Sequence, residues 1–322
     1  MAEKLVVDSR GTERTVRPNE RTIFESKKAS IVDEESILRH LGEAQRLAKE
    51  MEVGQKEASV VLHPEYPDLP VFIWLLCDSH LGSVQVNYDR FLKDYNLVKD
   101  TPNFYVLSNG DEIDHFMVHQ SKTSTGVYEN PITPQQQARL FRKLFKDLDN
   151  QGKVLGMTFG NHNQWLSSSG YNFEGTWLSD FKCPILNCGG RFNIDYEGQE
   201  YRVGATHKFW GSSKLNPTNA AKRYLEHVDE TLDVIFLAHT HQAEFLFFRR
   251  GNEVAYRYAI IGGTYKESDT WAAQVGIAGT RGQQGGFVLK LKPGERDIEI
   301  LRTVPEAEEY FQLLKGINER KR

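Results

Sequence analysis

The sequence predicts a mixed α/β fold in which two β-sheets pack face to face, with helices on their outer faces. In the first half of the chain, apolar runs of strand length alternate with helical patterns, which is typical of sheets with parallel strands. In the second half, strands follow one another through short turns, which is typical of antiparallel pairing. The chain has 322 residues, of which 39% are hydrophobic, so it is long enough to fill a substantial core.

The first half is expected to supply four strands and two helices. Apolar runs predict the strands, the first two of them buried, at 59–62, 71–77, 104–107 and 154–159. One helix is expected over 88–98. A second helix is expected to begin after Thr133, a residue type preferred at helix N-caps, and to run to about 149.

The second half is expected to consist mainly of strands. They are predicted at 192–196, 201–206, 234–238, 244–249, 254–261, 287–291 and 298–303. One helix, over about 219–230, interrupts them. The sequence contains no internal repeat and no low-complexity tract.

Residues 1–55 differ in character from the rest and are interpreted as a polar N-terminal arm. They are rich in charged residues and contain one amphipathic helical pattern over 34–51, with Ile37, Leu41 and Ala48 on its apolar face. The segment could be an arm that packs on the main body or on a partner, but a surface helix of the same domain is the favoured alternative, and a homo-oligomer is left open. Residues 56–322 are expected to form the main domain.

The composition argues against several functions. The net charge is −4, so the chain as a whole lacks the positive field typical of proteins that bind long nucleic acids or anionic membranes. No apolar run approaches the roughly 18 residues of a membrane span, and the first residues lack the apolar stretch of a signal peptide. The 3 cysteines form no CxxC pair and are typical of reduced thiols. We therefore expect a cytoplasmic protein without membrane contact.

Polar side chains gather where the predicted strands end. Carboxylates, imidazoles and one carboxamide follow five of them: Asp78 and His80, Asp111, Asn161 and His162, His207, and His239 and His241. In α/β sheets, ligands bind in the crevice beyond the carboxyl ends of the strands. Each piece is common on its own, but five in this order favour a shared metal site over coincidence.

These residue types suit divalent metals. Oxygen ligands combined with imidazole nitrogens favour Mn, Fe, Zn, Ni or Mg over metals that prefer thiolates. A carboxylate such as Asp111 can bridge two cations at roughly 3.5–4 Å. Gly110 and Gly160, which precede Asp111 and Asn161, are expected to allow the sharp turn that aims the next side chain at the site.

The motifs resemble those of the calcineurin-like metallophosphoesterase superfamily. The resemblance extends from about Val71 to Gly263 and is carried by Asp78-Ser79-His80, Gly110-Asp111, Gly160-Asn161-His162, His207 and Ala238-His239-Thr240-His241. It implies that 56–322 form a four-layer double β-sandwich flanked by helices, with a dinuclear metal centre. It also implies an enzyme that hydrolyses a phosphate ester with water activated between two divalent ions.

The resemblance further implies a role for each residue. The first metal would take Asp78, His80 and His241. The second would take Asn161, His207 and His239, and Asp111 would bridge the two. His162 would be the catalytic residue, because it would protonate the leaving oxygen or stabilise its charge. Manganese is the favoured metal, with Fe, Zn, Ni and Mg as alternatives.

The sequence departs from the superfamily pattern at two positions. Asn163 stands where members usually carry Asp or Glu, and Ala238 stands in place of a glycine. We interpret Asn163 as a residue that orients His162 by a hydrogen bond without stabilising its charged form.

Three long loops, over 111–134, 208–218 and 262–286, are expected to surround the metals and to select the substrate. Cations and aromatic rings in them could grip phosphate and stack on a base. The candidate substrate-binding residues are Asp114, His115, Lys208, Trp210, Lys214 and Arg281. The alternative for each aromatic residue is that it only anchors its loop.

Three functions remain in competition. The first is a phosphodiesterase acting on nucleotides or nucleic acid, since Asp78-Ser79-His80-Leu81-Gly82 resembles the opening motif of DNA-repair exonucleases in the superfamily. Short, single-stranded or cyclic substrates would fit the negative net charge better than long duplexes. The second is a phosphomonoesterase acting on a phosphoprotein or a small metabolite. A non-catalytic binding scaffold ranks last, because all seven proposed ligands are present.

Overall fold

The structure, a computed structural model, describes residues 4–7, 13–16, 34–52, 56–116, 130–168, 173–211, 215–249, 256–267 and 285–321. The chain divides into two compact units, 1–54 and 55–322, and each is described by itself. In the first unit, β1 (Lys4–Val7) pairs antiparallel with β2 (Glu13–Val16), and α1 spans Glu34–Glu52. The helix expected over 34–51 is thus present. The roles of a separate arm and a main domain stay predictions.

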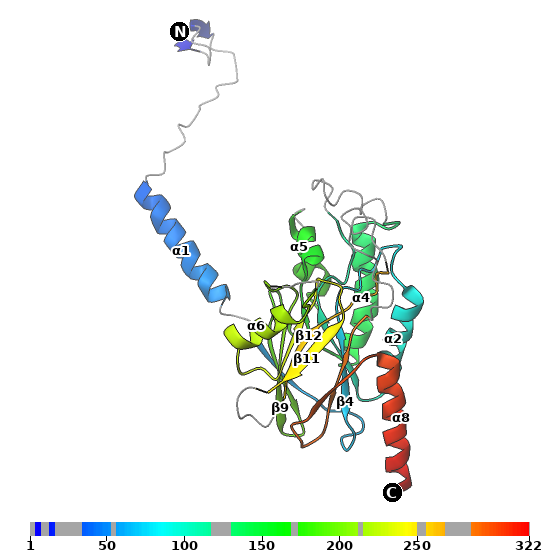
Figure 1. The fold of residues 1–322 in the computed structure, drawn as a ribbon. Helices are drawn as coiled ribbons and strands as arrows, with labels where there is room; N and C mark the ends of the chain where they lie inside the picture. Colours follow the sequence, from blue (N-terminus) through cyan, green and yellow to red (C-terminus); the bar gives the residue numbers. More distant parts are fainter. Residues whose placement is uncertain are drawn as a thin grey trace. The chain divides into compact units, whose positions relative to one another are not determined.

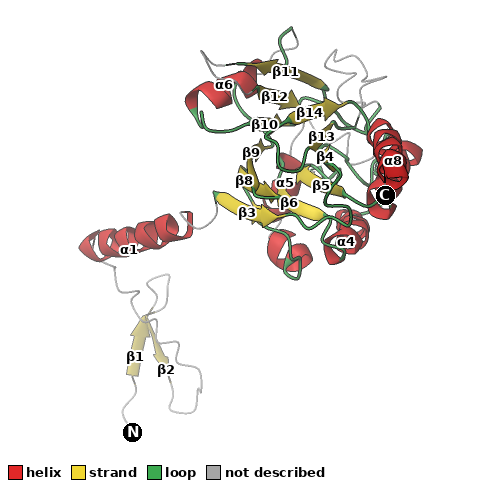
Figure 2. Cartoon of the chain, turned by 90° about the horizontal axis from the view of Figure 1, so that it is seen from below, coloured by secondary structure: helices red, strands yellow, loops and turns green. Residues whose placement is uncertain are grey.

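The second unit contains two six-stranded mixed sheets (Figures 1 and 2). In spatial order, the first sheet consists of β14 (Ile298–Leu301), β13 (Val288–Leu291), β4 (Val71–Leu76), β5 (Phe104–Asn109), β6 (Val154–Thr158) and β7 (Ile185–Leu186). The second consists of β11 (Glu244–Phe248), β12 (Arg257–Ile261), β10 (Val234–Leu237), β9 (Gln199–Thr206), β8 (Gly190–Tyr196) and β3 (Glu57–Val61).

Helices cover the outer face of each sheet. The first sheet packs against α2 (Tyr88–Asp100), α4 (Pro134–Asn150) and α8 (Val304–Lys321), and the second sheet packs against α6 (Asn219–His227). A separate apolar core lies between the two sheets. The layers therefore run helix, sheet, sheet, helix, which confirms the predicted fold class.

Strand β4 shows how the sequence produces these layers. Successive side chains of a strand point to opposite faces of its sheet. Phe72 and Trp74 enter the core beneath the helices, whereas Ile73 and Leu75 enter the core between the sheets. Because both faces of β4 are buried, the strand is apolar throughout, as the sequence indicated.

The structure corrects two expectations about the strands. The run at 59–62 was expected to be buried, but β3 is an edge strand whose residues alternate between exposed and half-buried, and Val61 is 59% exposed. The second expectation was a first half with parallel pairing and a second half with antiparallel pairing, and the sheets do not divide in this way. β13 pairs antiparallel with β4 in the first sheet, and β10 lies parallel to both β9 and β12 in the second.

Helix α4 begins at the residue that the sequence indicated, whereas three other helices were not predicted. The side chain of Thr133 accepts a hydrogen bond from the backbone of Gln136, whose side chain in turn accepts one from the backbone of Thr133, so a capping box begins α4. Helix α8 was not predicted, although Val304, Ala307 and Phe311 recur at helical spacing and are buried. The short helices α5 (Asn161–Ser168) and η1 (Glu174–Leu178) were also missed.

Candidate metal centre

The predicted ligands meet where strands of both sheets end. Asp78 and Asp111 follow β4 and β5, and Asn161 begins α5 after β6, so the first sheet supplies three ligand-bearing segments. The second sheet supplies His207 after β9 and His239 after β10. These carboxyl ends come together because the two sheets stack face to face, which the sequence could only imply.

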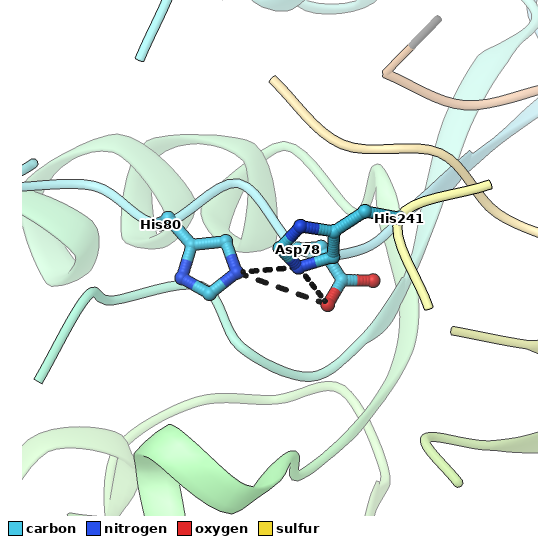
Figure 3. Close-up of side chains that lie close together, drawn as sticks. All are labelled: Asp78, His80 and His241. Carbon is cyan, nitrogen blue, oxygen red and sulfur yellow. Dashed lines mark hydrogen bonds and ion pairs between the residues drawn. The ribbon is translucent and has the colours of Figure 1, made fainter. Parts of the chain in front are cut away.

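One group of possible ligands consists of Asp78, His80 and His241, whose donor atoms lie within 4.8 Å of one another (Figure 3). Nε2 of His80 lies 3.0 Å from Nε2 of His241. Oδ1 of Asp78 lies 3.3 Å from Nε2 of His241 and 3.9 Å from Nε2 of His80. Three lone-pair-bearing atoms that converge in this way need a positive charge between them.

A second group consists of Asp111, His207 and His239, again with donor atoms within 4.8 Å of one another. Oδ2 of Asp111 lies 3.0 Å from Nε2 of His207. A third group contains His80, Asp111 and His162. Asp111 therefore lies within reach of imidazoles from both proposed metal positions, as a bridging carboxylate must.

Backbone groups fix the orientation of both carboxylates. Oδ2 of Asp78 accepts a hydrogen bond from the backbone N–H of His239 at 3.0 Å. Oδ1 of Asp111 accepts one from the backbone N–H of His162 at 2.8 Å. In each case one oxygen is held by the backbone, and the other faces ring nitrogens.

Two of the imidazoles are oriented through their second nitrogen. Nδ1 of His207 lies 2.8 Å from the backbone carbonyl oxygen of Asn109, and Nδ1 of His80 lies 2.8 Å from Oδ1 of Asp114. A proton on each Nδ1 would satisfy these contacts and leave Nε2 as the lone-pair donor. Metal-binding histidines are usually arranged in this manner.

The electrostatics of the centre favour cations. Burial by itself would raise the pKa of Asp78, but His241 and His207 outweigh it and lower the pKa to about 2. Burial would likewise lower the pKa of His207, but Asp111 and Asp78 raise it to about 10. Two buried carboxylates thus impose a strong preference for positive charge at this position.

The backbone is strained at the same residues. Five of the predicted ligands adopt positive φ angles: Asp78 and His80 at 46°, Asp111 at 54°, His239 at 72° and His241 at 57°. This region is unfavourable for residues with a Cβ, and each instance costs on the order of 1–3 kcal/mol. Strain of this kind collects at functional sites, where the surrounding fold enforces it.

The residues present fit divalent cations. Oδ1 of Asn161 is buried and has no hydrogen-bond partner in the described part of the chain. Buried polar atoms without partners are costly, so a ligand is expected there. Oxygen and imidazole donors are those that Mn²⁺ and similar ions accept.

The two glycines before the ligands serve different purposes. Gly110 has a φ of +83°, which agrees with the expected sharp turn. Gly160 is needed instead for close approach, because a Cβ there would lie 2.1 Å from Oδ1 of Asp111.

His162 lies beside the proposed metal positions in an aromatic setting. Its ring packs edge-to-face on His80 at 4.8 Å and on Phe116 at 4.7 Å, and it lies 4.5 Å from the ring of Trp165. Nε2 is 3.9 Å from Oδ2 of Asp111. Burial is the main cause that lowers the pKa of His162 to about 4.

The interpretation of Asn163 as the residue that orients His162 is wrong. Oδ1 of Asn163 accepts hydrogen bonds from the backbone N–H groups of Asp111 at 2.9 Å and Gly160 at 3.1 Å. Its Nδ2 donates to Oε2 of Glu112 at 2.9 Å. Asn163 therefore holds the backbone of two metal-site loops, and its side chain is not directed at the imidazole.

Asp114 is a second residue whose contacts differ from the expectation. It was predicted to bind substrate, but it is fully buried, and Oδ1 lies 2.8 Å from Nδ1 of His80 and 3.0 Å from Nζ of Lys266. Lys266 is also buried. Asp114 thus lies behind a proposed ligand, where it can orient that ligand.

The other candidate substrate residues differ in burial, and two of them are not described by the structure. His115 is buried, and burial lowers its pKa. Lys208 and Trp210 are exposed in the segment that follows His207. Lys214 and Arg281 lie outside the described residues.

Sequence reasoning missed two residues of the centre, Asn109 and Glu112. Asn109 donates to the backbone carbonyls of Thr206 at 3.2 Å and Phe236 at 2.8 Å, so it joins β5 to two strands of the other sheet. Glu112 accepts from Ser108 at 2.5 Å and from Asn163. A signal was available, because a polar Ser108-Asn109 pair ends a strand that is otherwise apolar.

No family model and no curated protein matches the chain. Among solved structures, it is similar to Vacuolar Protein Sorting 29 from Cryptosporidium parvum, with 13% identity, a TM-score of 0.39, and coverage of 72% of this chain and 97% of that chain. It is also similar to a metallophosphoesterase from Sphaerobacter thermophilus, with 15% identity, a TM-score of 0.37, and coverage of 72% and 88%.

A third solved structure is the calcineurin-like phosphoesterase YfkN from Bacillus subtilis, with 12% identity, a TM-score of 0.37, and coverage of 78% of this chain and 97% of that chain. Within the described residues, no helix is both long and apolar enough to cross a membrane. At 12–15% identity, these three structures are similar to the chain in fold alone.

Proposed function

We propose that this chain is a phosphoesterase that depends on two divalent metal ions. The observation that carries the proposal is the convergence of carboxylate and imidazole donors in two groups, each within 4.8 Å, at the carboxyl ends of strands from both sheets. One ion would be held by Asp78, His80 and His241, and the other by Asn161, His207 and His239. Asp111 would contact both ions.

The bound ions would act as Lewis acids toward the phosphate and supply an activated water as nucleophile. The chain's own residues prepare the site for this chemistry. Asp78 and Asp111 balance the charge of the cations, and their backbone hydrogen bonds hold them in place. The contacts at Nδ1 of His80 and His207 keep Nε2 of each ring available as a ligand atom.

We assign His162 a role at the leaving oxygen, either by transfer of a proton or, as the neutral ring that its lowered pKa favours, by a hydrogen bond to the developing charge. Its ring is held between Phe116 and Trp165, and Nε2 lies close to Asp111 without being tied to it by a hydrogen bond. His162→Ala should lower kcat roughly 10²–10⁴-fold, the usual contribution of a general acid. Metal content should stay near that of the wild type, because His162 is not a proposed ligand. Equal loss of metal and activity would make it a ligand or a structural residue.

Within this class, we propose a phosphodiesterase acting on nucleotides, with Mn²⁺ as the preferred ion. An exposed lysine and an exposed tryptophan directly after His207 support a substrate with both phosphate and a flat base.

The test is a comparison of kcat/KM for a phosphate diester and the matching monoester, with Mn²⁺ added to chelator-treated protein. We expect the diester to be preferred. A monoester preference of about tenfold or more would favour a phosphomonoesterase. No hydrolysis of either ester with any divalent ion would contradict the proposal.

A further inference from the structure

An exposed aromatic side chain, Trp210, pairs with the half-buried Arg223 in the segment that leads away from the candidate metal centre. Trp210 follows the proposed ligand His207 by three residues, which span at most about 11 Å between Cα atoms. It is 58% exposed, unusually open for a side chain of this size. Lys208, in the same segment, is exposed and directly follows His207. The segment 208–211 therefore borders the metal centre.

The pair is held in place by its surroundings. The guanidinium carbon of Arg223, on α6, lies 3.7 Å from the centre of the Trp210 ring. The neighbouring Phe209 packs edge-to-face on Tyr224 of the same helix at 5.1 Å, within the core beneath α6. These contacts fix the segment that follows His207 against α6, which lies beside β11 and β12 (Figure 1).

Gly211 completes the arrangement. Its φ of +98° favours glycine, and a Cβ at this position would lie 3.3 Å from Cδ of Arg223. Its carbonyl oxygen accepts a hydrogen bond from the side chain of Asn219 at 3.0 Å. The chain therefore turns sharply after Trp210, which leaves room for the Arg223 side chain over the ring.

This arrangement has the chemistry of a base-stacking site. Unpaired nucleobases stack on aromatic rings and on arginine guanidinium planes, and a cation beside the ring attracts the adjoining phosphate. A base within a duplex is already stacked on its neighbours and is not available in this way. The negative net charge of the chain also disfavours a long duplex held through many phosphates.

We propose that Trp210 and Arg223 form a subsite for one unpaired nucleobase of the substrate, so that the enzyme acts on nucleotide diesters or single-stranded nucleic acid. This inference rests on the proposed phosphoesterase function. Trp210 supplies the stacking surface, and Arg223 holds the ring and contacts the nucleotide.

The chain offers a matched control in Arg249 and Tyr256. Arg249 lies 4.3 Å from the centre of the Tyr256 ring, and Tyr256 is 42% exposed. β11 runs antiparallel to β12, with Glu244 beside Ile261 and Phe248 beside Arg257. Arg249 and Tyr256 therefore lie at the end of these two strands that is opposite to the metal centre.

The experiment compares two diesters that share one leaving group, thymidine 5′-(4-nitrophenyl) phosphate and methyl 4-nitrophenyl phosphate. Trp210→Ala and Arg223→Ala should raise KM for the thymidine ester roughly 5- to 100-fold and leave its kcat nearly unchanged. Trp210→Phe should raise KM for the thymidine ester less than Trp210→Ala does, because the phenyl ring can still stack. Trp210→Ala and Arg223→Ala should leave KM for the methyl ester unchanged. Tyr256→Ala should leave KM unchanged for both esters. Equal effects of Trp210→Ala on both esters, or no effect on either, would overturn the proposal.

A separate measurement keeps this inference distinguishable from the proposed function. If the wild type hydrolyses neither ester, the phosphoesterase proposal fails, and the subsite is then tested by the binding of fluorescein-labelled oligothymidylate in chelator. Weaker binding by Trp210→Ala than by Tyr256→Ala would support the subsite. Equal binding by the two variants would exclude it.

Discussion

At the scale of single residues, Asn163 makes a set of hydrogen bonds that a carboxylate at this position could not make. Its oxygen accepts from two backbone N–H groups, while its Nδ2 donates to Glu112. A carboxylate could accept but could not donate, and two buried acids would then face each other. The pairing was not visible in the sequence, because Glu112 and Asn163 are 51 residues apart and nothing in either motif indicates the contact.

The contact between Asn163 and Glu112 predicts that a second substitution can restore stability lost by the first. Asn163→Asp should lower the free energy of unfolding by about 1–3 kcal/mol, because it removes the donor to Oε2 of Glu112 and places a second carboxylate beside it in a buried site. Adding Glu112→Gln should restore most of this loss, since a glutamine amide can donate to the new carboxylate. Denaturant unfolding of the wild type, both single variants and the double variant provides the measurement. A double variant no more stable than Asn163→Asp would show that the two side chains do not act as a pair.

Asp114 leads to a second prediction at this scale. Asp114→Asn should weaken Mn²⁺ binding roughly 10- to 100-fold, because the residue orients the proposed ligand His80 and Lys266 stabilises its charge. Calorimetric titration with Mn²⁺ measures the effect.

The control for Asp114 is Asp94→Asn. Asp94 is a buried carboxylate on α2 that accepts a hydrogen bond from the hydroxyl of Tyr265 at 2.6 Å. Its substitution should lower stability and leave Mn²⁺ affinity unchanged. Equal losses of affinity in the two variants would show that any buried carboxylate in this region matters only for folding.

At the scale of elements, strand β5 carries an asparagine beside each of its ends. Asn109, its last residue, donates to the carbonyls of Thr206, which ends β9, and of Phe236 in β10. Asn103, just before its first residue, donates to the carbonyls of Tyr66 at 2.8 Å and Pro70 at 3.2 Å. The first contact joins the two sheets at the metal centre, and the second holds a loop at the far end of the strand.

These two residues give a matched pair of variants. Asn109→Ala and Asn103→Ala should each lower the free energy of unfolding by about 2–4 kcal/mol, since each removes two or more hydrogen bonds made by a buried amide. Only Asn109→Ala should also weaken Mn²⁺ binding, because the ligands of one sheet would lose their register with those of the other. Thermal unfolding and calorimetry on both proteins test this. Unchanged metal affinity in Asn109→Ala would mean that the sheets keep their register without this contact.

The elements were predictable to the extent that their signals are local. Thr133 marked the start of α4, and the apolar run of β4 reported burial on both faces. Edge position is not local, however, and the run at 59–62 looks as apolar as a central strand. β13 also joins the first sheet by pairing with β4, more than two hundred residues away in the chain, and β14 then pairs with β13. Periodicity cannot reveal such pairing.

At the scale of the whole molecule, the residues of the proposed centre could be listed from the sequence, but their support could not. Asp78, Asp111 and His207 each follow a predicted strand within a recognisable motif, so they could be identified from the sequence. Asn109 and Glu112 depend on how the two sheets meet, and their hydrogen bonds exist only in the folded chain. The backbone strain at the ligands has no signal in the sequence either.

The central claim is that this fold assembles two divalent metal positions. Elemental analysis of the purified protein after loading with Mn²⁺, combined with calorimetric titration, tests it most directly. We expect about two ions per chain in the wild type, about one in His241→Ala and in His239→Ala, and the greatest loss in Asp111→Ala, which removes the carboxylate proposed to serve both ions. A wild-type protein that binds no divalent ion, while remaining folded, would contradict the account.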